Sequence, residues 1–236
     1  MAGFKTHITV STLVGIGYGG AAYALFDVPA PTCILAGGLC GVSGMLPDID
    51  SGPGVPLRES LAFGAAVVST LLASRLLQFD VARETVVLAA AITYLLVRFG
   101  LAELLKRYTV HRGMFHSIPA AIIFGELTFL LSTGELEMRY YKAGAVVLGY
   151  LSHLVLDELY SLQLHRGRLA PKKSFGTAVK LVGRGWWPNF STYGKLALLT
   201  FVVMQEPGWT KDYLQQHVAS DRVEQTAAQI VDRFLR

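Results

Sequence analysis

Two long stretches near the start of the chain carry no charged residue. Residues 6–26 contain no Asp, Glu, Lys or Arg over 21 positions, and residues 28–47 contain none over 20. A helix that crosses the hydrocarbon core of a membrane needs about 20 such residues. Only 16% of the 236 residues are charged, against roughly 25% in a typical soluble domain. The chain is therefore neither disordered nor an ordinary soluble enzyme.

Further apolar segments follow at 60–79, 85–101, 117–132 and 143–162, with occasional ionisable residues inside them. One of these, Glu126, is expected to pair with Arg75 or Arg98, or to line a polar cavity. The short run Leu196–Met204 is too brief to span and is expected in the membrane interface. These patterns predict an all-α, polytopic membrane helical bundle with about four to six membrane segments.

The two ends of the chain need separate interpretations. Lys5 before an apolar stretch, with Ala22-Tyr23-Ala24 after it, is compatible with a cleaved signal peptide, but an immediate second span favours a retained helix. We assign residues 1–205 to one membrane-embedded domain. Residues 206–236 are predicted to be a C-terminal amphipathic helix, because apolar residues recur there at helical spacing. Cys33 and Cys40 are expected to be small core residues.

The distribution of basic residues predicts the orientation. If six segments alternate across the membrane, the loops on the N-terminal side carry 12 Lys and Arg residues and the opposite loops carry three, which are Arg83, Arg139 and Lys142. Basic loops stay in the cytoplasm. The N-terminal side is therefore predicted to be cytoplasmic. The formal net charge of +4 also favours contact with anionic lipid.

Polar residues that could bind a metal ion or take part in catalysis gather on this same side. Four separate stretches of the chain deliver them to the predicted cytoplasmic ends of the segments, and they are His7, Asp48, Asp50, His111, His116, His153 and Asp157. His153 and Asp157 are four residues apart on one helix face, which suits a shared metal ion. Mixed His and Asp ligands fit Zn²⁺ best, with Mn²⁺ or Fe as alternatives, and such ions activate water.

Each motif also has an ordinary structural explanation. His153 and Asp157 could form a local hydrogen-bonded pair, the Asp48–Asp50 stretch could be a helix-ending turn, and the residues around His111 could be an interfacial loop. Ionisable residues within membrane segments are nevertheless costly and usually functional. Their placement on one side favours a shared metal site.

The combined motifs resemble the YdjM family. They are His7, Leu46-Pro47-Asp48-Ile49-Asp50-Ser51, His111-Arg112-Gly113-Met114-Phe115-His116-Ser117 and Ser152-His153-Leu154-Val155-Leu156-Asp157, and Lys172 to Ala178 resembles a bacterial subgroup. The family is described as inner-membrane, candidate metal-dependent hydrolases with a LexA-binding label. The order of the ligands is more distantly similar to zinc-dependent phospholipase C and single-strand nucleases, which implies phosphoester hydrolysis. Fewer ligands than in those enzymes carry over to this chain, which indicates one or two metals instead of three.

These inferences lead to two functional hypotheses. The first is a metal-dependent hydrolase in the bacterial inner membrane that acts on a phosphoester or lipid-type substrate at the cytoplasmic face. Asp48 or Asp50 would act as base or metal bridge, and Arg112, Lys172 and Lys173 would hold the anionic group. The second is a non-enzymatic regulatory protein or metal carrier that uses the same site. Membrane lipid is the expected partner. The basic run 166–195 is not accompanied by a nucleic-acid-binding motif, and it is also compatible with a simple topology signal.

Overall fold

The structure, a computed structural model, describes residues 3–50, 55–101, 113–165, 168–171, 176, 178–183 and 185–206. Within these ranges, the side chains of Asp50, residues 55–57, Glu59, Leu101 and both strands lie outside the description. The predicted C-terminal amphipathic helix begins at residue 206 and falls almost entirely outside the described residues.

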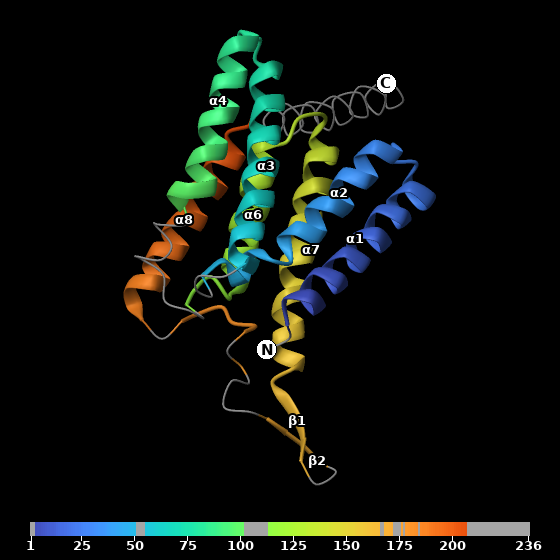
Figure 1. Cartoon of the computed structure of the whole chain (residues 1–236), viewed down its shortest axis with the longest axis vertical. Helices are drawn as coiled ribbons and strands as arrows, with labels where there is room; N and C mark the ends of the chain where they lie inside the picture. Colours follow the sequence, from blue (N-terminus) through green and yellow to red (C-terminus); the bar gives the residue numbers. More distant parts are fainter. Residues whose placement is uncertain are drawn as a thin grey trace, which may run out of the picture.

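The described chain is a helical bundle, which confirms the predicted α-helical class (Figure 1). Its α-helices are α1 (Phe4–Phe26), α2 (Ala30–Ser43), α3 (Val55–Gln78), α4 (Arg83–Leu95), α6 (Ile118–Leu131), α7 (Leu136–Leu159) and α8 (Trp186–Met204). A 3₁₀ helix η1 (Leu46–Asp50) follows α2, and a π-helical segment η2 (Leu96–Leu101) extends α4. The short antiparallel hairpin of β1 (Leu162–His165) and β2 (Arg168–Pro171) was not predicted.

Successive helices run back and forth between two ends of the bundle. We call the end where α1 and α6 begin and α2 and α7 end the proximal end, and the other end the distal end. The N-terminus and the β-hairpin lie at the proximal end in Figure 1. At the distal end, Ala22, Val28 and Cys33 pack together with Met138 and Tyr141 from the start of α7. The alternation agrees with the expected order of segments.

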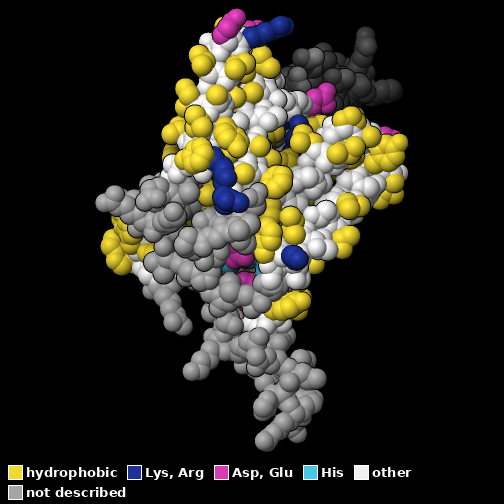
Figure 2. Space-filling view, viewed as in Figure 1, with side chains coloured by type: hydrophobic (Ala, Val, Ile, Leu, Met, Phe, Trp, Pro, Cys, Tyr) yellow, Lys and Arg dark blue, Asp and Glu magenta, His cyan; other side chains and the backbone are white. Residues whose placement is uncertain are grey.

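The outer surface of the bundle is strongly apolar. Large side chains such as Phe26, Ile34 and Trp186 are at least 75% exposed, and Figure 2 shows hydrophobic side chains over most of the upper part of the molecule. Extended apolar surface of this kind is typical of contact with lipid. By length and composition, two described helices can cross a membrane, Phe4–Phe26 and Ser60–Gln78. The shorter apolar helices α2 and α6 have 14 residues each, about 21 Å of helix.

Glycines allow α2 to pack closely between α1 and α7. A Cβ atom placed on Gly15 of α1 would lie 2.4 Å from the Gly37 carbonyl oxygen of α2. One placed on Gly149 of α7 would lie 2.0 Å from the Cys40 carbonyl oxygen. Small residues at helix contacts are a common means of association in membranes, because they bring backbones together. Cys33 and Cys40 are buried free thiols, as expected of core residues.

Helix α8 links the proximal and distal ends of the bundle. The segment before it is held at the proximal end, where the Ile118 amide donates to the Lys180 carbonyl at 3.0 Å. Further along α8, the Thr200 hydroxyl donates to Glu126 of α6 at 2.6 Å, so Thr200 is the partner of Glu126 rather than Arg75 or Arg98. The apolar run 196–204 is therefore half of a 19-residue helix packed along α6, rather than a short separate segment.

A group of charged side chains fastens the end of α8 to the distal end. Glu206 accepts two hydrogen bonds from Arg75 of α3, both at 2.8 Å, and one from Arg139 of α7 at 3.0 Å. The sequence pattern predicts a loop at Arg139 and Lys142, but the structure places both residues in a helix. They lie buried in the first turns of α7, and they donate to the carbonyls of Phe129 and Thr133 at the end of α6. Cations satisfy the unpaired carbonyls of a helix end in this position.

Glu206 is expected to stabilise the bundle in a pH-dependent way. Burial opposes its ionisation, but the hydrogen bonds and charges of Arg139 and Arg75 outweigh burial and lower the pKa of Glu206. A carboxyl with a lowered pKa stabilises the folded state above its unfolded pKa of about 4.3 and loses this contribution as pH falls through the folded value. Glu206→Gln should lower the free energy of unfolding by about 2 kcal/mol at pH 7.

Thermal unfolding of the full chain in detergent checks this expectation at several pH values. The difference between wild type and Glu206→Gln should shrink as pH falls below the unfolded pKa of about 4.3, because the unfolded carboxyl is protonated first and the folded one follows at its lowered pKa. Glu84→Gln, at an exposed position on α4, serves as the control and should stay close to wild type. Equal stability of Glu206→Gln and wild type at pH 7 would contradict the role of Glu206.

Candidate metal centre

Five of the predicted ligands meet at the proximal end of the bundle. They come from the first turn of α1, from η1, from the segment before α6 and from the last turns of α7, and they are His7, Asp48, His116, His153 and Asp157. Four of these side chains are almost completely buried, whereas the side chain of Asp48 is 24% exposed. Figure 2 shows a small area of acidic and histidine side chains in the lower part of the molecule.

The distances among these side chains are longer than a direct charged hydrogen bond. His7 Nε2 lies 3.3 Å from Asp157 Oδ1, and the Nε2 atoms of His116 and His153 lie 3.6 and 3.7 Å from Asp48 Oδ1. A direct charged hydrogen bond is about 2.8 Å long. Two ligands that each lie about 2.1 Å from one tetrahedral ion are about 3.4 Å apart. The separations therefore fit a set of ligands arranged around a shared cation.

The orientation of His153 supports this interpretation. Its Nδ1 atom lies 2.7 Å from the carbonyl oxygen of Gly44, at the end of α2. A carbonyl only accepts hydrogen bonds, so this contact places the ring proton on Nδ1 and leaves a lone pair on Nε2. That lone pair faces the carboxylates of Asp48 and Asp157, at 3.7 and 3.9 Å. A backbone carbonyl that fixes the tautomer of a ligating histidine is a common feature of metal sites.

His7 and His153 stack on each other inside the cluster. Their ring centroids are 3.7 Å apart and their planes differ by 14°. Neither ring nitrogen of His7, nor Nε2 of His153, has a hydrogen-bond partner within the described residues. A buried polar atom without a partner costs about 1–3 kcal/mol, and an absent ion is one of its recognised explanations. The donor set of three imidazoles and two carboxylates fits a divalent cation such as Zn²⁺.

Two groups of potential ligands share His153. The first combines His7, Asp48 and His153, and the second combines His116, His153 and Asp157. Within each group the donor atoms lie within 4.8 Å of one another. The arrangement can accommodate one ion, or two ions that use opposite sides of the cluster.

Asp48 is the ligand that opens toward the outside of the bundle. Burial opposes its ionisation, but interactions with the imidazole of His116, and then with those of His153 and His7, hold the pKa of Asp48 below its ordinary value. Asp48 is therefore ionised at neutral pH. Its position in a 3₁₀ helix directly after Pro47 directs it toward the cluster from the end of α2.

Several residues that position the site were not identified from the sequence. Tyr150 donates to the Phe115 carbonyl, which fixes the segment that carries His116. Ser117 caps α6 by accepting a hydrogen bond from the Ala120 amide. The serine before Pro119 is a recognisable N-cap signal. The hydrogen bond between the Gly44 carbonyl and His153 could not be predicted from the sequence, because every residue has a backbone carbonyl.

Glu158, which follows Asp157 in α7, holds two backbone amides of the segment between β2 and α8. Its carboxylate accepts backbone hydrogen bonds from Gly176 and Ala178. Gly176 has φ +77°, a conformation that favours glycine. Ala178 is 5% exposed, so this loop end is packed into the protein.

The remaining predicted site residues cannot be placed. His111, Arg112, Lys172 and Lys173 lie outside the described residues. The backbone of Asp50 ends η1, but its side chain lies outside the description. Their assignments stay predictions.

Comparison with known proteins gives one match that covers most of the chain. The family described as YdjM inner membrane protein matches residues 1–211. No curated protein and no solved structure matches significantly.

The cluster is expected to bind a divalent metal with His153 at its centre. Full-length protein purified in detergent should contain about one or two equivalents of zinc, manganese or iron by elemental mass spectrometry. His153→Ala should lose all of it, because His153 belongs to both groups of ligands. If two ions bind, His116→Ala should lose one and keep the other.

Glu126→Gln provides a matched control, since Glu126 is a carboxylate in the adjoining helix α6 that contacts Thr200 instead of the cluster. It should keep the wild-type metal content. Folded wild type that binds no metal after incubation with Zn²⁺, Mn²⁺ or Fe²⁺ would contradict the metal site.

Proposed function

This chain belongs to the YdjM inner membrane protein family, and we propose that it is a membrane-embedded, metal-dependent hydrolase. The observation that carries the proposal is the lone pair of His153 Nε2, which the Gly44 carbonyl directs at Asp48 and Asp157. The partial exposure of Asp48 adds to it, because structural zinc sites are closed whereas catalytic ones keep an open position.

The residues of the cluster have distinct roles in this mechanism. His7, His116, His153 and Asp157 would hold the ion together with Asp48, and Zn²⁺ fits this donor set best, with Mn²⁺ or Fe as alternatives. When bound, such an ion polarises an ester and lowers the pKa of water to about 7. Asp48 Oδ1 faces the imidazoles, so we assign proton transfer from the attacking water to Oδ2. Asp50 is the second candidate base.

The proposed substrate is a phosphoester or a lipid-type ester with an anionic group. Arg112, Lys172 and Lys173 would bind that group, because their cations suit phosphate oxygens. The contact of Glu158 with Gly176 and Ala178 supports this role for the two lysines. It holds Gly176 and Ala178, which follow the two lysines in the sequence, against the residue next to Asp157 in α7.

The proposed location is a multi-pass inner-membrane protein whose site faces the cytoplasm. The excess of basic residues in the predicted loops on the proximal side supports this orientation. The alternating course of α1, α2, α3, α4, α6 and α7 supports six segments, and α8 would add a seventh crossing.

A metal carrier is less well supported than a hydrolase. A carrier needs polar groups that continue from the site to the opposite membrane face. Between the cluster and the distal end, the described interior is packed mainly with small apolar residues, Ala36, Cys40 and Ala145 in one cluster and Ala22 and Cys33 in the next, with Tyr18 and Tyr141 against them.

Asp48→Asn is expected to abolish hydrolysis while the protein stays folded. General base catalysis contributes about 10²–10⁴-fold, so hydrolysis of p-nitrophenyl phosphate, bis(p-nitrophenyl) phosphate or dipalmitoyl phosphatidic acid should fall by at least about 100-fold. The remaining ligands should retain metal, which elemental analysis checks. Asp80→Asn is the control, because Asp80 is in the left-handed region at φ 56°, which Asn also tolerates. Unchanged hydrolysis in Asp48→Asn would exclude the proposed role.

Cysteine labelling tests the orientation. Arg58 lies at the proximal end of α3 and Glu84 at the distal end of α4, and both are exposed. A membrane-impermeant maleimide should label Glu84→Cys in intact spheroplasts, and Arg58→Cys only after the membrane is opened. Cys33 and Cys40 are buried and should give little background. The reverse labelling pattern would place the site on the outer face.

A further inference from the structure

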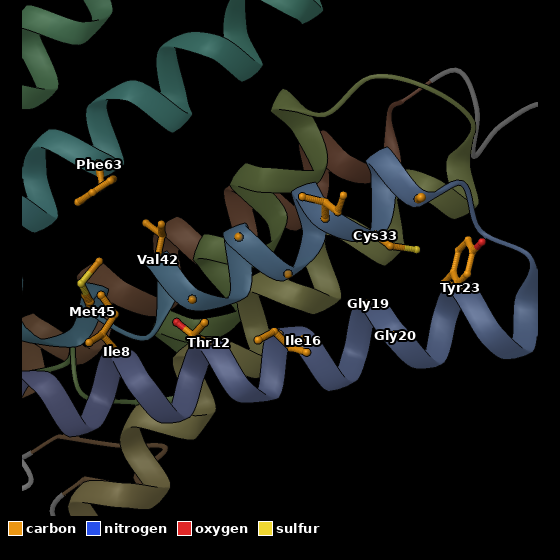
Figure 3. A pocket seen from close by; sticks show the side chains of 16 residues that line it. Ile8, Thr12, Ile16, Gly19, Gly20, Tyr23, Cys33, Val42, Met45 and Phe63 are labelled. Carbon is orange, nitrogen blue, oxygen red and sulfur yellow. The ribbon is translucent and has the colours of Figure 1, made fainter.

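A long groove runs along the outer side of the contact between α1 and α2 (Figure 3). It has a volume of about 520 Å³, within the range of about 300–1,000 Å³ found for ligand pockets. Ile8 and Met45 lie at one end and Tyr23 at the other, and Phe63 of α3 approaches from the side. Apart from the hydroxyls of Thr12 and Tyr23, the lining consists of apolar side chains, a thiol and glycine.

Glycines create the middle of this groove. Gly15 of α1 faces Gly37 of α2, Gly19 faces Cys33, and Gly20 and Gly38 also line the groove. Gly19 is needed for helix packing, since a Cβ there would lie 2.8 Å from the Cys33 carbonyl oxygen. Gly20 and Gly38 are not, because a Cβ on either would meet nothing within 4 Å. The sequence thus leaves empty space at positions where packing does not require glycine.

The dimensions and environment of the groove suit a hydrocarbon chain. Ile8 and Tyr23 are 15 positions apart on one helix, which corresponds to about 22 Å. One leaflet contributes about 15 Å to the hydrocarbon core of a bilayer. The groove is therefore long enough for the acyl chain of a lipid, and it lies on α1, a helix that can cross the membrane.

The groove ends beside the metal cluster. Ile8 follows His7 directly in α1, and Met45 follows Gly44, whose carbonyl fixes His153. A chain lying in the groove would therefore bring its polar end to the same end of the bundle as Asp48.

We propose that the groove binds an acyl chain of the substrate, so that the hydrolase acts on a membrane lipid whose phosphoester reaches the His and Asp cluster. The inference rests on the proposed hydrolase function and names its substrate class. A transmembrane helix of a second copy is a less suitable occupant, because Gly15 and Gly19, the small residues that let helices approach, already pack against α2.

Photolabelling tests the groove without relying on activity. The probe is phosphatidic acid with a diazirine in the middle of one palmitoyl chain, added to the full-length protein in dodecyl maltoside micelles. Crosslinks should map to residues 8–23 and 30–45, and excess dipalmitoyl phosphatidic acid should compete with them. Gly20→Leu and Gly38→Leu fill the groove and should lower labelling at least fivefold. Gly17→Leu is the control, because Gly17 lies outside the groove and also has open space around it.

Hydrolysis assays on the same variants test the link to catalysis. Gly20→Leu and Gly38→Leu should lower kcat/KM for dipalmitoyl phosphatidic acid at least tenfold and leave p-nitrophenyl phosphate, which has no acyl chain, unchanged. Gly17→Leu should change neither rate.

The outcomes separate this inference from the proposed function. If Gly20→Leu and Gly38→Leu leave labelling unchanged, the acyl chain does not bind in the groove. If wild type forms dimers that these variants abolish, a second copy of the chain occupies the groove, and the inference is also overturned. Loss of labelling with normal lipid hydrolysis would mean a structural lipid and would overturn the substrate role. If metal-loaded wild type hydrolyses neither dipalmitoyl phosphatidic acid nor p-nitrophenyl phosphate, the proposed hydrolase function is refuted. If labelling remains specific in that case, the groove is a lipid-binding site without a role in catalysis.

Discussion

The hydrogen bond between His153 and the Gly44 carbonyl connects the packing of the bundle to its chemistry. It forms only because α2 ends against α7, and α2 reaches that position because Gly149 lets its backbone approach the Cys40 carbonyl. The same contact decides which nitrogen of His153 carries the proton. Its Nε2 atom then carries a lone pair that faces two carboxylates. These negative groups repel one another unless a cation lies between them, so a divalent cation would stabilise the arrangement.

The two ends of the bundle solve the problem of buried charge in different ways. At the distal end, the carboxylate of Glu206 neutralises part of the charge of Arg75 and Arg139, and helix carbonyls accept the remaining donors. At the proximal end, carboxylates and imidazoles face one another at 3.6 and 3.7 Å, longer than a direct charged hydrogen bond. Buried polar groups of the first kind hold helices together, whereas those of the second kind resemble a ligand set. This contrast, more than the residue types alone, makes the proximal cluster a candidate site.

Much of the fold and part of the site could be predicted from the sequence. The helical class and the approximate bounds of α1, α2, α3 and α6 followed from uncharged and apolar runs, whose lengths reflect helix geometry directly. Helix α7 begins at Leu136, seven residues before the predicted segment. The course of α8 was missed, because its first half contains Trp, Asn and Tyr and does not read as apolar. Glu206 was also missed as a partner of Arg75, since an ion pair between residues 131 positions apart leaves no local pattern.

The sequence by itself determined which residues could act together. His7, Asp48, His116, His153 and Asp157 each sit at a segment end, and the alternation of segments brings those ends to one side, so their convergence follows from chain direction. Only the tertiary structure decided how they meet. The tautomer of His153, the stacking of His7 on it and the exposure of Asp48 depend on how closely α1, α2 and α7 pack. Interhelical distances of this kind arise from the small residues of several helices at once, and no single segment contains that information.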